Sequence, residues 1–328
     1  MKKSFLLCIL VGIALIFPLM DKAQAAPFAK GDVFAGVGGG TIKVFSSTGT
    51  LKQTLTTAPG FPTGSEDTGM GFDSAGNLYA TLFEAGAVAK FDSSGTFMGL
   101  FASGISGHPE SVAIDKAQNI YIGVTDSGLN QILKYNTSGT LLSTYVGLPA
   151  DRGFDWIDLA ADQKSMHYTG EGTNIRIADI TSPPGTFVGI FASGLGGTAY
   201  AHRILADGSE LLANSVNVLH IDAAGNIIQT YPKPLGETSF LFALNLDPDG
   251  TSFWTGGYST GNVYEINIAT GALEESFNAG IVGGSMAGLA VFGEITSGGG
   301  GTVPIPTTIY LLGSGLAALG AWRMKFRA

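Results

Sequence analysis

A hairpin-like segment with one glycine in its turn recurs six times along this chain of 328 residues. Each copy alternates apolar and polar residues on both sides of the turn, a period-2 pattern that is typical of paired β-strands. The turn glycines are Gly49, Gly95, Gly139, Gly185, Gly225 and Gly271, and their successive spacings are 46, 44, 46, 40 and 46 residues. So regular a repeat restricts the chain to architectures in which one small unit is stacked or arranged in a ring.

A second hairpin pattern lies between successive copies of the first. Phe72–Tyr79 and Ile114–Tyr121 are its clearest copies, with Asp, Asn or Gly supplying the turn, and weaker copies occupy 159–168, 204–212 and 246–254. Two hairpins per repeat of about 44 residues give four strands, which is one blade of a β-propeller.

The two ends of the repeat region predict how the ring closes. The first repeat lacks an inner strand before Val33, whereas Ala287–Phe292 reads as a strand with no hairpin after it. We expect this strand to complete the first blade, because ring closure removes exposed sheet edges. A seventh blade would need a further hairpin that the sequence does not supply. The prediction is an all-β, six-bladed propeller over residues 30–295, with four antiparallel strands per blade.

Composition agrees with this fold and excludes one class of partner. Charged residues make up only 13% of the chain, and glycine, which weakens helices, occurs 49 times. Residues 26–302 contain 11 basic and 25 acidic side chains, a net charge of −14. Nucleic-acid binding requires a basic surface, so an acidic body argues against it. The single cysteine, Cys8, precedes this body, so no disulfide is expected within it.

Residues 1–25 have the pattern of a secretory signal peptide. Two lysines are followed by an apolar stretch over 5–20, and Ala23 and Ala25 form a cleavage site of the A-x-A kind. We therefore expect export and removal of this segment. An uncleaved helical anchor is the alternative.

The C-terminal segment 303–328 follows a glycine-rich spacer at 296–302 and has three successive parts: a proline box, an apolar stretch and a basic end. An apolar stretch, 309–322, is expected to form a helix, although its 14 residues fall short of the ~20 needed to cross a bilayer comfortably. The residues that define the three parts are Val303, Pro304 and Pro306 in a proline box, Gly313, Ser314 and Gly315 in the apolar stretch, and Arg323, Lys325 and Arg327 at the basic end.

The segment 303–328 resembles the PEP-CTERM sorting signals of Gram-negative bacteria. Those signals join a Val-Pro-Glu-Pro-like box, a short helix with a Leu-Leu-Gly-Ser-Gly-Leu core and a basic end. Residues 311–316 match the core, whereas Ile305 stands where the box most often has glutamate. The resemblance implies transport across the inner membrane, processing by an exosortase-type peptidase, and a location at the cell surface or in the extracellular matrix. A plain C-terminal membrane anchor is the alternative.

The repeats also carry a resemblance. The Asp-x-x-Gly-Asn-apolar-Tyr motif of Asp73–Tyr79 and the surrounding Gly-x-apolar-x-x-apolar rhythm are similar to NHL-repeat and gluconolactonase-like six-bladed propellers over residues 30–295. The resemblance implies the fold but not one function, because propellers serve both enzymes and binding platforms.

Aligning the repeats on their inner strands predicts which side chains reach the central channel. Glu110 and Asp155 occupy equivalent positions in neighbouring blades and could converge, and carboxylate oxygens suit Ca²⁺ or Mg²⁺. Gluconolactonase-like propellers hold a divalent metal in the channel with Glu, Asp and Asn ligands, which implies the same role for these two residues. A solvated rim without metal is the alternative. The further candidates for the channel rim are Glu66, Asp67, Thr68, His108, Tyr200, His202 and Phe242.

No nucleophile elbow, zinc-binding pair or phosphate-binding loop occurs in the sequence. No catalytic residue is therefore predicted. The absence of these motifs, together with the sorting tail at 303–328, favours a surface or matrix module that binds polysaccharide or protein rather than an enzyme. A metal-dependent lactonase or related hydrolase is the alternative.

Overall fold

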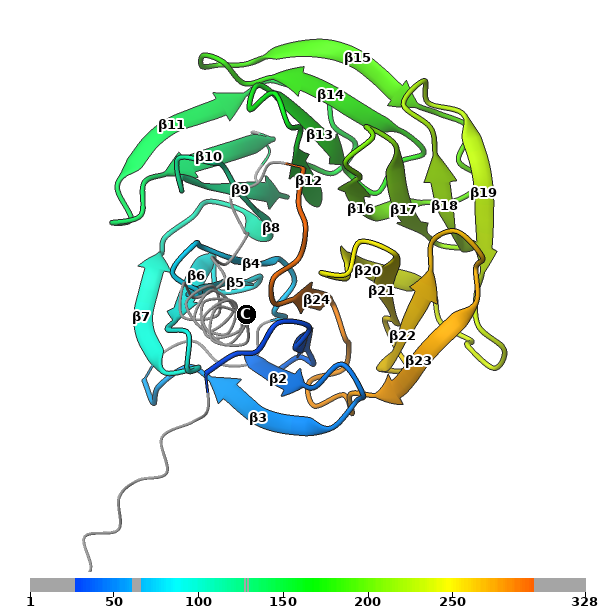
Figure 1. Ribbon diagram of the computed structural model, residues 1–328. Helices are drawn as coiled ribbons and strands as arrows, with labels where there is room; N and C mark the ends of the chain where they lie inside the picture. The colour runs from blue at the N-terminus through cyan, green and yellow to red at the C-terminus, as the bar shows by residue number, and fades with distance from the viewer. Residues whose placement is uncertain (1–26, 61–65, 127, 129, 298–328) are drawn as a thin grey trace, which may run out of the picture.

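The computed structural model describes residues 27–60, 66–126, 128 and 130–297. Within these ranges, six antiparallel sheets of four strands each surround a central axis (Figure 1). The predicted all-β, six-bladed propeller is therefore confirmed. The predicted signal peptide and sorting tail lie outside the described residues. In the part of the chain that is described, no helix is long and apolar enough to cross a membrane.

Each blade runs from an inner strand at the axis to an outer strand at the rim. Blade 1 contains β24 (Gly288–Val291), β1 (Val33–Gly36), β2 (Thr41–Phe45) and β3 (Leu51–Thr56); blade 2 contains β4 (Met70–Phe72), β5 (Leu78–Leu82), β6 (Ala87–Phe91) and β7 (Phe97–Ala102); blade 3 contains β8 (His108–Ile114), β9 (Ile120–Thr125), β10 (Gln131–Tyr135) and β11 (Leu141–Val146). Blade 4 contains β12 (Trp156–Leu159), β13 (Ser165–Thr169), β14 (Ile175–Asp179) and β15 (Thr186–Ala192); blade 5 contains β16 (Ala199–Ile204), β17 (Glu210–Asn214), β18 (Asn217–Ile221) and β19 (Ile227–Pro232); blade 6 contains β20 (Leu241–Leu246), β21 (Ser252–Gly257), β22 (Asn262–Asn267) and β23 (Leu273–Asn278).

The ring closes as predicted from Ala287–Phe292, the strand that has no hairpin after it in the sequence. β24 pairs with β1 in antiparallel register, with Val33 opposite Val291 and Gly36 opposite Gly288. Both glycines lie directly against the next blade: a Cβ atom at either one would come within about 2 Å of the Asp67 carbonyl oxygen. The two chain ends of the propeller thus meet in one sheet, and small residues let that sheet pack closely on blade 2.

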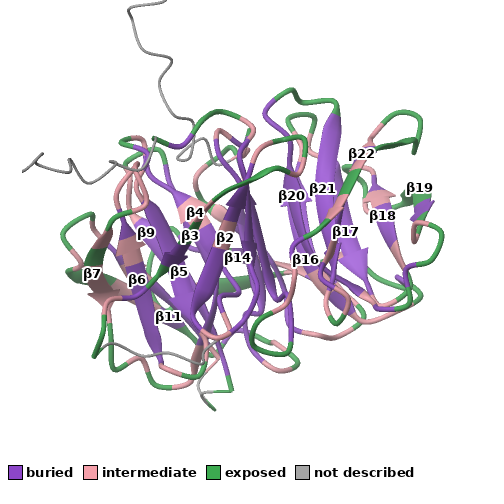
Figure 2. Cartoon of the chain, turned by 90° about the horizontal axis from the view of Figure 1, so that it is seen from below, coloured by how far each residue is buried: buried purple, intermediate pink, exposed green. Residues whose placement is uncertain are grey.

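The hydrophobic core lies between neighbouring blades rather than at the centre of the ring. One cluster joins blades 1 and 2 through residues such as Phe34, Phe72 and Phe91, and another joins blades 2 and 3 through Tyr79 and Ile122. Inner and middle strands are therefore almost wholly buried, whereas loops are mostly exposed (Figure 2). The outer strands keep one face toward solvent, which explains their alternating apolar pattern.

The repeated sequence motif has a structural role in turns. The Asp73 carboxylate accepts hydrogen bonds from the backbone of Ala75 and Asn77, from the Asn77 side chain at 2.8 Å and from the Tyr79 hydroxyl at 3.1 Å. The corresponding Asp in blade 3, Asp115, accepts the equivalent bonds from the backbone and side chain of Asn119 and from the Tyr121 hydroxyl. All six predicted turn glycines have φ between 71° and 88°, a conformation that favours glycine.

One end of the ring is covered by the chain itself. After β24 the chain runs across the centre of the ring in the view of Figure 1, where the Ser297 hydroxyl donates to the Leu159 carbonyl at 2.8 Å. Glu294 accepts a 2.8 Å hydrogen bond from the buried Arg203. The cavity left at this end has a volume of only about 40 Å³. These contacts lie at the C-terminal ends of the inner strands and cover the central channel there. Two larger cavities on this face, of about 380 and 480 Å³, are lined mainly by residues of the outer parts of the blades and lie away from the axis.

Candidate binding site at the channel mouth

The N-terminal ends of the inner strands surround an open cavity of about 330 Å³. Inner strands supply some of its side chains, including Glu110 from β8 and Tyr200 from β16. Others follow the second strands of their blades, as Glu171 follows β13. We call this cavity the channel mouth, and its lining consists of Glu66, Phe83, Glu110, Arg152, Glu171, Tyr200, Phe240, Phe242 and Tyr258. Its volume is at the lower end of the range for small-molecule sites.

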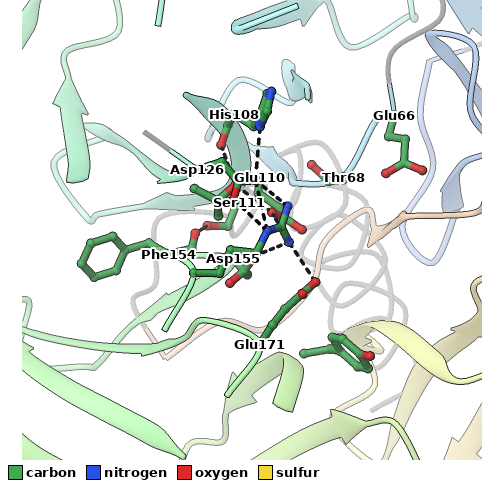
Figure 3. A network of polar contacts seen from close by, with 12 residues as sticks. Glu66, Thr68, His108, Glu110, Ser111, Asp126, Phe154, Asp155 and Glu171 are labelled. Carbon is green, nitrogen blue, oxygen red and sulfur yellow. Dashed lines mark hydrogen bonds and ion pairs between the residues drawn. The ribbon is translucent and has the colours of Figure 1, made fainter. Parts of the chain in front are cut away.

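Three carboxylates meet on one side of the channel mouth. Glu110, Asp155 and Glu171 each place an oxygen within 4.8 Å of the other two, and Figure 3 shows them converging from different segments of the ring. Glu110 and Asp155 are only 2% exposed. The two residues that the repeat alignment placed at equivalent positions are thus neighbours in space, and Glu171 joins them from a loop.

Arg152 lies among these carboxylates and contacts all of them. Its Nη1 atom is 2.7 Å from Asp155, 2.8 Å from Glu171 and 3.4 Å from Glu110. Its Nε and Nη2 atoms donate to Asp126 at 3.1 and 3.0 Å. Every nitrogen of the guanidinium therefore faces a carboxylate. The single positive charge of Arg152 forms ion pairs with four acidic side chains.

The electrostatics of the cluster follow from burial and from Arg152. Burial raises the pKa of Glu110 and of Asp155, and the nearby guanidinium opposes this rise without cancelling it. Asp126 is more exposed: partial burial opposes the change, but hydrogen bonds from Arg152 and His108 lower its pKa. The buried pair consequently keeps a proton to higher pH than isolated carboxyls do, while Asp126 stays ionised.

Aromatic rings form the other side of the channel mouth. Tyr200, Phe240 and Tyr258 stack in a row, with ring centroids 5.1 and 4.9 Å apart. Phe242 contacts both tyrosines, at 5.0 and 5.3 Å. The Tyr258 hydroxyl donates to Glu66 at 2.9 Å, and burial raises the pKa of that hydroxyl to about 12. An aromatic wall thus faces the acidic cluster, with Glu66 at its edge.

The remaining predicted rim residues lie close to the channel mouth or deeper in the ring. Asp67 and Thr68 are 1% exposed, and the Thr68 hydroxyl hydrogen-bonds to Thr81 at 2.8 Å. His108 stacks on Phe83 with centroids 4.4 Å apart. His202 is fully buried and does not line the cavity. The structure therefore brings Glu66, Glu110, Tyr200 and Phe242 to one cavity and packs Asp67, Thr68, His108 and His202 around or away from it.

Several residues of the channel mouth did not emerge from the inner-strand alignment. The residues that this alignment does not include are Phe83, Arg152, Glu171, Phe240 and Tyr258 in the lining and Asp126 beside it; the sequence singles out Phe240 and Tyr258 only as aromatics that could line a binding face. Phe83, Asp126 and Tyr258 each come directly after the second strand of a blade, and Glu171 comes two residues after one. Because the second strand runs antiparallel to the first, its end lies beside the start of the inner strand. Aligning the repeats on the ends of their second strands would have identified these four.

The three carboxylates have the oxygen chemistry that Ca²⁺ and Mg²⁺ require. However, the Arg152 guanidinium is within ion-pair distance of each of them. In this arrangement the positive charge comes from the protein, and a metal would have to displace Arg152. The arrangement fits an arginine-neutralised acidic cluster better than a preformed metal site, and the metal role of Glu110 and Asp155 stays a prediction.

Comparison with known proteins shows the fold alone. No family model and no curated protein sequence matches the chain. A protein of unknown function from Bacteroides caccae is similar in structure, with a TM-score of 0.61 and 15% identity over 80% of this chain and 98% of that one. A chain of a nidogen–laminin complex has a TM-score of 0.61 and 17% identity, over 79% and 97%. A gluconolactonase from Xanthomonas campestris has a TM-score of 0.56 and 15% identity, over 71% and 84%. Identities this low support a shared propeller architecture, and not a shared activity.

Proposed function

We propose that this protein is a binding module whose ligand site is the channel mouth. The observation that carries the proposal is the pairing, in one open cavity, of the aromatic wall with the carboxylate cluster. Aromatic faces bind rings and apolar chains, and carboxylates fix the orientation of polar groups. The opposite end of the central channel is covered by residues 294–297, so a ligand would enter the channel from the channel mouth.

The ligand in this proposal is extracellular, as part of a polysaccharide or a protein. Export through the signal peptide at 1–25 and sorting of the tail at 303–328 by an exosortase-type peptidase rest on the sequence. The described chain ends at Ser297 on the covered face. If the tail holds the protein at a membrane, this geometry directs the channel mouth away from that membrane and toward the surroundings.

An array experiment with matched variants tests the site. The full-length chain would be applied to glycan and peptide arrays, together with Phe240→Ser and Phe187→Ser. Phe240 belongs to the aromatic wall, whereas Phe187 is a 39% exposed aromatic on β15, far from the axis. We expect bound ligands to be lost with Phe240→Ser and kept with Phe187→Ser. Retention by Phe240→Ser, with loss by Phe187→Ser, would move the binding site to the rim.

A metal-dependent lactonase or related hydrolase is the second candidate. The close approach of Glu110, Asp155 and Glu171 favours it. The ion pairs of Arg152 with these three carboxylates disfavour it, because a metal would have to displace the guanidinium. Terbium luminescence and a lactone panel test this candidate, with Ca²⁺ as competitor. The hydrolase proposal expects Ca²⁺ binding and lactone turnover that both disappear in Glu110→Ala. Absence of both activities in the unaltered protein would end it.

A further inference from the structure

The channel mouth contains more negative than positive groups. Glu66, Glu110 and Glu171 line the cavity, and Arg152 is the cation of the lining. All three nitrogens of Arg152 are already directed at carboxylates, including Asp126. One guanidinium therefore leaves an excess of carboxylate groups facing the cavity.

Hydrogen-bond acceptors are also in excess over free donors. Asp155 lies next to the lining rather than in it, and its buried Oδ2 atom receives no hydrogen bond from a nitrogen or hydroxyl of the described residues, although the carboxyl shares a hydrogen bond with Glu110. Glu66 accepts hydrogen bonds only from the neutral hydroxyls of Tyr258 and Ser285, and it has no ion pair within the described ranges.

The Tyr258 hydroxyl and the Arg152 nitrogens, which could donate to a ligand, already donate to carboxylates. The Tyr200 hydroxyl is the remaining donor of the described lining. The cavity thus offers acceptors to a ligand that brings its own donors.

The aromatic wall sets the shape of the rest of the ligand. Tyr200, Phe240 and Tyr258 stand side by side and present apolar surface to the cavity opposite the carboxylates. Each hydroxyl of a neutral sugar brings one donor but two acceptor lone pairs, and those acceptors gain nothing from carboxylates. A primary ammonium group carries three donors and no acceptor. Ammonium groups also gain from nearby aromatic rings.

We propose that the ligand of the channel mouth is an organic cation, a primary ammonium attached to a ring or short apolar chain. The ammonium lies beside Glu110 and Glu171, with Glu66 at the edge of the aromatic wall, and the apolar part lies against that wall. This inference rests on the proposed function, because it assumes that the channel mouth is the ligand site. It adds the chemical class of the ligand.

Calorimetric titration of the full-length chain at pH 7 tests the charge requirement. Benzylammonium and benzyl alcohol have nearly the same shape and differ in charge. We expect benzylammonium to bind at least tenfold more tightly, a difference of about 1.4 kcal/mol. Its binding should release protons, seen as a heat that depends on the buffer, because a cation beside Glu110 and Asp155 favours their ionised forms. Glucosamine and glucose form a second charged and neutral pair, which distinguishes amino sugars from simple amines.

Matched variants locate the effect. Glu66→Gln and Glu171→Gln should each weaken benzylammonium binding about tenfold and leave benzyl alcohol unchanged. Glu275→Gln makes the same change of charge on the outer strand β23 and should change neither. Circular dichroism verifies that each variant is folded, and two variants at separate positions guard against a local folding defect.

The outcomes separate this inference from the proposed function. If neutral probes bind as tightly as their cations and lose affinity only with Phe240→Ser, the charge requirement is overturned and the ligand site stands. If no probe and no array ligand depends on Phe240, both the inference and the proposed function fail.

Discussion

Replacing Asp67 by asparagine should make the propeller progressively more stable, relative to the unaltered protein, as the pH rises from 4 to 7. Asp67 is 1% exposed, and its Oδ2 atom has no hydrogen-bond partner among the described residues. Burial first, then the charges of Glu84 and Glu66, raise the pKa of its carboxyl to about 8, although the backbone of Thr41 opposes the rise. The native fold therefore holds a proton that the unfolded chain releases.

The sign and size of the effect follow from this difference. The unfolded carboxyl has a pKa near 3.8, so between that value and pH 8 the native state binds more protons and stability falls as the pH rises. At pH 7 the difference of about three pKa units corresponds to about 4 kcal/mol. An asparagine does not titrate, so the variant escapes this loss. Its amide needs new partners, at about 1–3 kcal/mol, but that cost is the same at every pH.

Denaturant unfolding followed by circular dichroism at pH 4, 5.5, 7 and 8 measures the effect. The free energy of unfolding of Asp67→Asn minus that of the unaltered protein should rise by about 4 kcal/mol between pH 4 and pH 7. Asp222→Asn is the control, because Asp222 is exposed and hydrogen bonds from Asn226 lower its pKa. The control should show no such rise. A flat difference for Asp67→Asn would refute the claim that this carboxyl is neutral in the fold.

Three further variants can be examined by the same unfolding assay. Gly225→Ala should destabilise the fold by at least about 1 kcal/mol more than Gly194→Ala. Both glycines have positive φ, but only at Gly225 would the new Cβ lie 2.1 Å from a backbone atom, the Phe191 carbonyl oxygen. Equal losses of stability would contradict this reasoning. Glu210→Gln should cost about 2 kcal/mol at pH 7, because burial opposes ionisation but hydrogen bonds with two histidines lower the Glu210 pKa to about 2. That loss should shrink as the pH falls from 4.5 toward 2, and a constant loss would contradict the charge assignment. Arg152→Gln should cost about 3 kcal/mol at pH 7 by leaving buried carboxylates unneutralised, and less at pH 5; an unchanged stability would show that the cluster does not need its cation.

The sequence was sufficient for the fold because each blade repeats the same local chemistry. Positive φ at the hairpin turns requires glycine at every repeat, so the spacing of Gly49 and its five equivalents revealed the number of blades. Ring closure was predictable for a different reason: β24 had no partner in its own repeat and β1 had no inner neighbour, so pairing them was the only way to complete both.

The candidate site was only partly predictable, because a repeat alignment places residues inside strands and not in loops. Glu110 and Asp155 could be placed together from their blade positions. Arg152 could not, since it lies in the irregular segment between β11 and β12, where no repeat position exists. Glu171 has a φ of 56° after β13, so its direction depends on a local conformation that is unusual for a residue other than glycine. The cation at the centre of the cluster is therefore a feature that only the three-dimensional structure reveals.

Hydrogen–deuterium exchange of the full-length chain, with and without the ligand best retained on the arrays, tests the central claim that the channel mouth is the binding site. The account predicts protection in peptides that contain Glu110, Arg152 to Glu171, Tyr200 and Phe240 to Tyr258, because these segments surround one cavity. The outer strands β11, β15 and β19 should exchange at unchanged rates. Protection confined to those outer strands, with none at the channel mouth, would contradict the account.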